Sequence, residues 1–123
     1  MRLTGRIYGN HADKGATTMA KPYAVITRQI IDDSDPDPSY LEQKGYEERL
    51  QQYRNGDFSF VGVRASAELH TPYGNDWIQS HLTSPGVWGI ESDSDESYFD
   101  AVFADEKAIL LEMLGEMNRL EIV

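Results

Sequence analysis

The sequence predicts a single α+β domain in which two helices pack on one face of a three- to four-stranded, mostly antiparallel sheet. Three observations favour this class: four short runs have strand patterns, two amphipathic helical patterns separate and follow them, and the hydrophobic content of 40% is typical of a folded chain. With 123 residues, the chain is long enough for one core and too short for two. The expected order of elements is β-α-β-β-β-α.

The N-terminal part contains a leader and the first strand. Residues 1–18 have little apolar periodicity, so we expect a flexible leader followed by one acidic domain over residues 19–123. From Tyr23, the run YAVITRQII is apolar on both faces, which is typical of an interior strand. The next segment, DDSDPDP, is expected to be a solvated connection, because its prolines and acids suit neither a strand nor a helix.

The middle of the chain predicts one helix and three strands. The helix should begin at Ser39 and end at the Asn55-Gly56 pair. Alternation in FSFVGVRASAEL predicts a strand with one buried face, and WIQSHL predicts a shorter one. Residues 84–87, SPGV, have Pro and Gly in the order of a type II turn and therefore predict a hairpin into the run VWGI. The last three strands should form an antiparallel meander.

The C-terminal segment has the clearest helical pattern. Apolar residues recur every three or four positions from Phe99 to Leu120, which makes one broad apolar stripe. At its start, Asp93 and Glu96 have the spacing of a capping box, and the other acids there suit the positive end of the helix dipole.

Glu106 interrupts this apolar stripe. A carboxylate on a buried face needs a partner or marks a groove, because an unpaired buried charge is costly. Three interpretations stay open: Glu106 pairs with an arginine of the sheet, such as Arg28 or Arg64, it is a functional carboxylate, or it lies exposed at the edge of the stripe.

The net charge of −10 is unevenly distributed. Residues 1–31 carry a net charge of +4 and residues 32–123 carry −14. An acidic body repels nucleic-acid phosphates, so direct binding of DNA or RNA is not expected. The chain has no cysteine, which excludes disulfides and thiolate chemistry. No run approaches the about 20 apolar residues of a membrane span, and no signal-peptide core is present, so we expect a cytoplasmic protein without membrane contact.

Seven acids lie within the sixteen residues ESDSDESYFDAVFADE. If the chain stays extended there, Glu91, Asp93 and Asp95 form a row with a spacing of about 6.6 Å, similar to a row of phosphates. The alternative is a solvated loop that caps the helix. The first interpretation predicts a partner-binding surface made of Trp88, Glu91, Asp93, Asp95, Glu96, Tyr98 and Asp100.

The chain also contains residue types that could form a zinc site or a hydrolytic triad. His70 and His81 flank a predicted strand connection and, with Asp76, supply the ligand types of a zinc site, although histidines at strand ends are commonly structural. Ser80 and Ser84 with His81 and Asp76 supply the residue types of a hydrolytic triad, without a nucleophile-elbow motif. The acids fit no EF-hand register, and there is no Walker, GxGxxG or HExxH motif, so no cofactor is predicted.

The segments YRNGDFSFVGV and VWGIESDSDESY, followed by an acid-rich helix, resemble small uncharacterised acidic proteins of bacteriophages and bacterial mobile elements. The resemblance covers residues 40–120, and WGIESDS at 88–94 is its most specific part. A more local similarity to the ArdB/KlcA anti-restriction proteins lies in Tyr53, Arg54, Gly56, Phe58 and Phe60. These resemblances imply an accessory protein that inhibits host defence, such as an anti-CRISPR or anti-restriction protein.

We therefore expect a non-enzymatic protein that binds a basic host protein, such as one of a nucleic-acid-handling complex, through its acidic surface. A second hypothesis is a small metal-dependent enzyme that uses Glu106 or the pair His70 and His81. A third is a structural protein that oligomerises through its helices. The sequence leaves the oligomeric state open.

Overall fold

The structure is a computed structural model that describes residues 20–123, so the leader expected at residues 1–18 lies outside the described part. The chain is an α+β domain with a four-stranded, mostly antiparallel sheet and two α-helices, which confirms the predicted fold class. In chain order the elements are β1 (Tyr23–Asp32), the 3-10 helix η1 (Pro38–Glu42), α2 (Glu47–Arg54), β2 (Phe60–Tyr73), β3 (Asp76–Thr83), β4 (Val87–Glu91), α3 (Glu96–Glu116) and the 3-10 turn η2 (Met117–Arg119).

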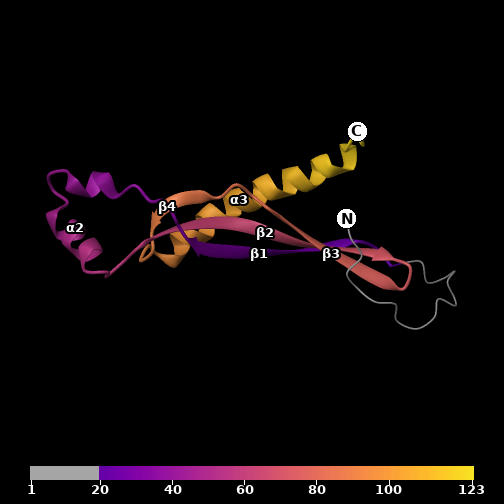
Figure 1. Cartoon of the computed structure of the whole chain (residues 1–123), viewed down its shortest axis with the longest axis horizontal. Helices are drawn as coiled ribbons and strands as arrows, with labels where there is room; N and C mark the ends of the chain where they lie inside the picture. Colours follow the sequence, from indigo (N-terminus) through magenta and orange to yellow (C-terminus); the bar gives the residue numbers. More distant parts are fainter. Residues whose placement is uncertain (1–19) are drawn as a thin grey trace.

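The strand β2 is the centre of the sheet (Figure 1). Along one edge it pairs with all ten residues of β1, from Tyr23 opposite His70 to Asp32 opposite Val61. Along the other edge, β3 pairs with the second half of β2, and β4 pairs with residues near its start. All pairings are antiparallel. Because β2 has fourteen residues, its second edge has room for both short strands.

The hairpin predicted at residues 84–87 is wrong, because β3 and β4 run one after the other along the same edge of β2. Ser84 joins them: its N–H donates to the carbonyl of Ala65 and its Oγ accepts from the Ala65 N–H, both at 2.9 Å. Pro85 and Gly86 then bulge outward, with Gly86 at a φ of +90°. Pro and Gly suit a bulge with positive φ as well as a turn, and the free edge of β2 favours the bulge.

The core lies between β2 and α3. Residues of odd number in β2 face the helix, and Val61 and Val63 pack there against Phe99 and Val102 of α3. Further along, Leu110 is fully buried against the small side chains of Ala65 and Ala67. The apolar stripe predicted for this helix is confirmed in its first four turns.

The two helices do not share one face of the sheet. The α3 helix lies on the face, whereas α2 packs with η1 beyond the end of the strands (Figure 1). There, Leu41, Leu50 and Tyr53 surround Phe58 and Phe60 in a second, smaller core. Gly45, at a φ of +100°, interrupts the single helix expected from Ser39, so only the part after it is α-helical.

The remaining features of the fold concern the helices. The last part of α3 rises away from the strands (Figure 1), and Met117 and Leu120, which follow α3 and continue its apolar stripe, are exposed. None of the helices within residues 20–123 is long and apolar enough to cross a membrane.

Gly62 is required by close packing on the face of the sheet opposite α3. A Cβ at this position would lie 2.2 Å from Cε3 of Trp88, well inside contact distance. The indole therefore lies flat on a bare stretch of β2, and its Nε1 donates to the carbonyl of Pro85 at 3.0 Å.

We expect Gly62→Ala to displace Trp88, because the methyl group and the indole cannot occupy the same space. Measured in a Trp77→Phe background, the fluorescence of Trp88 should shift to the red, and the free energy of unfolding should fall by about 1–3 kcal/mol. Gly115→Ala is the matched control, since a Cβ there meets nothing within 4 Å. An unchanged emission spectrum in the Gly62 variant would contradict this packing.

Candidate functional site

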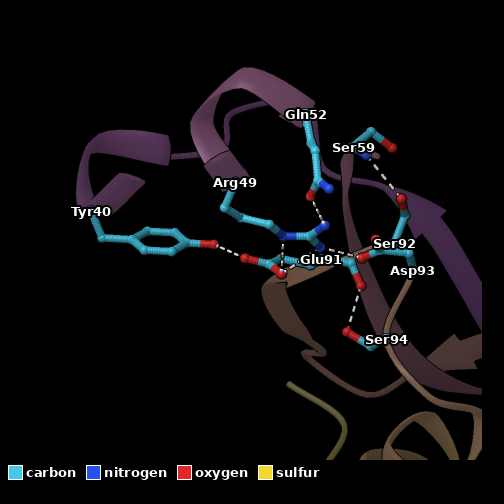
Figure 2. Close-up of polar contacts among 8 residues, drawn as sticks. All are labelled: Tyr40, Arg49, Gln52, Ser59, Glu91, Ser92, Asp93 and Ser94. Atoms are coloured by element: carbon cyan, nitrogen blue, oxygen red, sulfur yellow. Dashed lines mark hydrogen bonds and ion pairs between the residues drawn. The ribbon is translucent and has the colours of Figure 1, made fainter. Parts of the chain in front are cut away.

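The acidic junction between β4 and α3 is folded around Arg49 of α2 (Figure 2). The Arg49 Nη2 lies 2.7 Å from Glu91 Oε1 and 2.5 Å from Asp93 Oδ1, and its Nη1 donates to Gln52 at 2.8 Å. The guanidinium also lies over the ring of Phe58, with Cζ 3.6 Å from the ring centroid. On the other side of Glu91, the hydroxyl of Tyr40 donates to Oε2.

The charges in this cluster stabilise one another. The hydrogen bonds that Arg49 donates to Asp93 and then to Glu91 raise the pKa of Arg49, and the bond from Arg49 holds the pKa of Asp93 below its ordinary value. The pKa of the Tyr40 hydroxyl is raised, mainly by burial and further by its hydrogen bond to Glu91. Arg49 is therefore a permanent cation that holds two carboxylates of the junction against the small core of α2.

The predicted extended row of carboxylates is wrong. The strand β4 ends at Glu91, and a turn follows in which the N–H of Ser94 donates to the Glu91 carbonyl at 3.0 Å. Asp93 points back to Arg49, and Asp95, rather than Asp93, is the N-cap of α3, without a side-chain capping bond. Turn formation prevents the spacing of about 6.6 Å that an extended strand would give.

A second arginine forms ion pairs with two further acids of the predicted surface. Arg28 of β1 lies 2.5 Å from Glu96 and 2.8 Å from Asp100, both in the first turns of α3. These carboxylates are two-thirds exposed, so the pairs are surface ion pairs with modest energies. They fix α3 relative to the edge of the sheet.

The predicted partner-binding residues therefore fall into three places. Glu91 and Asp93 lie in the cluster around Arg49. Asp95, Glu96, Tyr98 and Asp100 lie at the exposed start of α3, while Trp88 lies on the opposite face of the sheet against Gly62. Tyr98 and Trp88 are each a little under half exposed, but the sheet separates them, so they cannot anchor one small partner surface together.

Glu106 is a buried carboxylate, so it is not exposed at the edge of the stripe, and its partner is not the arginine of the first interpretation. The residue is 4% exposed, and its Oε1 accepts a 2.6 Å hydrogen bond from the N–H of Gly86. Arg28 pairs with α3 acids instead, and Arg64 donates to Gln29. Glu106 thus holds the bulge that joins β3 to β4.

His70 and His81 do meet on one face of the β2–β3 hairpin, but not with Asp76. Glu68 lies between them, with Oε1 2.8 Å from His70 Nε2 and Oε2 3.6 Å from His81 Nε2. Asp76 points to the other face and accepts from the N–H of Trp77. Within residues 20–123, no three His, Asp or Glu side chains are grouped closely enough to hold a metal ion. The predicted zinc set is therefore not assembled.

The residue types of a hydrolytic triad are likewise dispersed. Ser84 Oγ is buried and accepts from the Ala65 N–H, and Ser80 and His81 are neighbours on one strand, so their side chains point to opposite faces. Asp76 shares the face of Ser80 rather than that of His81.

The central role of Arg49 was not predicted from the sequence. Its signal is limited to a basic residue one helical turn before Tyr53 on an otherwise weakly patterned helix, which does not indicate which acids it contacts. The chain matches no protein-family model, no curated protein and no solved structure.

We expect Arg49→Ala to destabilise the junction, because Glu91 and Asp93 lose their shared cation and repel each other. The free energy of unfolding should fall by about 1–2 kcal/mol, as for other partly exposed charged hydrogen bonds. Chemical denaturation measures the change, and Arg54→Ala, on the exposed side of the same helix, is the control. Equal stability of the two variants would show that the cluster contributes nothing.

The Arg49 contribution should depend on pH. The pKa of Asp93 is lowered in the folded chain from its ordinary value of 3.8, so the ion pair stabilises the fold fully above that value. The contribution is lost as the pH falls through the lowered pKa. The difference in stability between the wild type and Arg49→Ala should therefore shrink in acid, which denaturation at a series of pH values measures.

Glu106→Leu should be more harmful than Glu106→Gln. Glutamine keeps an acceptor for the Gly86 N–H, whereas leucine leaves that donor unpaired at a cost of about 1–3 kcal/mol. Thermal denaturation of both variants measures the difference. A Glu106→Leu variant more stable than Glu106→Gln would contradict this explanation. The hydrogen bond from Gly86 would then not account for the buried carboxylate.

Proposed function

We propose that the chain is a non-enzymatic, cytoplasmic binding protein that recognises a basic host protein through the exposed acidic side of α3. The observation that carries this proposal is the surplus of negative charge at the junction. Six carboxylates of residues 91–105 face only two guanidinium groups, those of Arg28 and Arg49, which leaves four negative charges uncompensated. Such a surface attracts lysine- and arginine-rich partners.

The internal ion pairs define which acids are available. Asp95, Asp105 and Glu112 are exposed and have no ionic partner among the described residues. Asp105 and Glu112 are seven positions apart, so they lie on the same side of α3, with the exposed ring of Tyr98 on that side one helical repeat earlier. This α3 acidic surface offers carboxylates at intervals together with one aromatic contact.

The partner should belong to the proteins that normally hold nucleic-acid phosphate. Their basic surfaces match a rigid helix with repeated carboxylates, and the resemblance to acidic proteins of phages and mobile elements favours a host-defence target. In this proposal the protein occupies the partner's basic nucleic-acid-binding channel and prevents nucleic acid from entering it. Its tightest contacts are expected at Tyr98, because aromatic side chains are favoured at binding hot spots.

The test is capture of partners from a bacterial lysate at low salt with a variant that reverses three free acids, Asp95→Lys, Asp105→Lys and Glu112→Lys. The control variant reverses Glu42, Glu48 and Asp57, which are exposed near α2, and has the same net charge. A basic partner should be retained by the wild type and the control and lost by the α3 variant. The affinity of the α3 variant for the purified partner should be about tenfold or more below that of the wild type.

Salt provides a second criterion. Exposed charges are screened when the Debye length shortens, so binding should weaken strongly towards about 0.5 M salt. Binding that is equal for both triple variants, or insensitive to salt, would contradict recognition through the α3 acidic surface.

A further inference from the structure

The strand β1 has the sequence of an interior strand but lies at the edge of the sheet. In YAVITRQIID, apolar residues occur on both faces, yet only β2 pairs with β1 among the described residues. As a result, Tyr23 is 52%, Val25 is 44% and Ile30 is 40% exposed. A long apolar edge strand with unpaired backbone groups is a template for pairing with another strand.

The hydrogen bonds show which backbone groups of β1 are free. The Asp33 N–H donates to the Phe60 carbonyl at 3.0 Å, in the register that places Asp32 opposite Val61. In an antiparallel pair these bonds alternate, so odd residues of β1 point to β2 and even residues point away from it. Among residues 20–123, the N–H and C=O groups of Ala24, Ile26, Arg28 and Ile30 therefore have no backbone partner.

This edge lacks the features that normally prevent pairing. Its ten pairs with β2 form one uninterrupted register without a bulge, and the strand contains no proline or lysine. Arg28 is its only basic residue, and α3 already holds that side chain through Glu96 and Asp100. The edge is thus straight, long and almost neutral on a chain that is otherwise strongly acidic.

A groove lies beside the start of β1. It has a volume of about 320 Å³ and opens to solvent between β1 and the last turn of α3, with Ala24, Leu114 and Met117 among the residues that line it. The small side chain of Ala24 leaves the space that a larger neighbour on an added strand would fill.

We propose that the free edge of β1 pairs with β1 of a second copy, in an antiparallel arrangement about a two-fold axis at Thr27. This register places Ile30 of one copy opposite Ala24 of the other, so the exposed isoleucine enters the groove beside the small alanine. Tyr23 then lies opposite Ile31. The two sheets become one continuous sheet, and both α3 helices lie on the same face.

Charge and side-chain identity select this register. It places Lys21 of one copy opposite Asp33 of the other, but the Asp33 carboxylate already accepts from the N–H groups of Asp35 and Gly89. The fit of Ile30 beside Ala24, rather than an ion pair with Lys21, therefore favours this register. A register centred on Arg28 would instead place two guanidinium groups directly opposite each other, which is unfavourable. Even residues meet even residues in the chosen register, so the free backbone groups point at one another.

Sedimentation of the full chain over a wide range of concentrations tests the proposal. We expect a species of twice the 13.9 kDa chain mass, which added salt strengthens, because screening reduces repulsion between two acidic copies. This dependence is opposite to that expected for binding to a basic partner. A single-chain mass at every concentration would overturn the proposal.

Two variants address the interface. Ile30→Lys places a charge at the groove, and Ala24→Pro removes an outward N–H without breaking the ladder to β2. Each should raise the dissociation constant of the dimer by about tenfold or more. Val87→Lys is the matched control, because Val87 is 39% exposed and lies on the opposite edge of the sheet. A dimer that survives both edge variants, or that Val87→Lys disrupts equally, would overturn the proposal.

If the edge variants fold poorly, hydrogen exchange of the wild type tests whether β1 pairs with a second copy. The amides of Ala24, Ile26 and Ile30 should be protected at high concentration and lose protection on dilution, whereas those of Val25 and Ile31 stay protected. Removal of residues 1–18 should leave this pattern unchanged. If the amides of the even-numbered residues were protected at every concentration and lost this protection when residues 1–18 were removed, that segment, rather than a second copy, would pair with β1.

Discussion

The structure depends on the need of β2 to pair its backbone groups along both edges. Fourteen residues of extended chain leave donors and acceptors on each side, and burial of its odd-numbered face under α3 makes unpaired groups there costly. One edge is satisfied by a single long partner, β1. The other is satisfied by two short strands and, at the gap between them, by the backbone and hydroxyl of Ser84. Glu106 reaches from α3 to this same gap, so the helix that covers the core also supports the place where pairing changes register.

The acids of the junction have two different roles. Arg49 and Arg28 each hold a pair of carboxylates, one pair against the α2 end and one pair against β1, so four acids help to orient elements. Asp105 and Glu112, farther along α3, have no ionic partner among the described residues and are exposed to solvent. A dense acidic run thus combines structural ion pairs with a surface that attracts basic groups, and its binding properties depend on the second set alone.

Local patterns predicted much of this fold, and contacts between distant residues account for what they missed. The period of α3 and the alternation in β2 identify both elements, because each pattern follows from one buried face. The order of β3 and β4 does not follow from residues 84–87, since Pro-Gly fits a hairpin or a bulge and the length of β2 decides between them. Glu106 was recognisable as an interruption of the stripe, but its partner is a backbone amide, which carries no sequence signal. Arg49 lies more than forty residues before the acids it binds.

The α2 arm, residues 38–58, is connected to the sheet in a way that makes it a separate unit of stability. Its small core reaches the sheet through Phe60 of β2, and its polar attachment to the rest of the domain is concentrated at Arg49 and Tyr40, both of which contact Glu91. A group of elements with few shared contacts can open without unfolding of the whole domain. Loss of the contacts at Glu91 and Phe60 would therefore expose a segment of about twenty residues to proteases, while the packing of α3 on Val63 and Ala65 is retained.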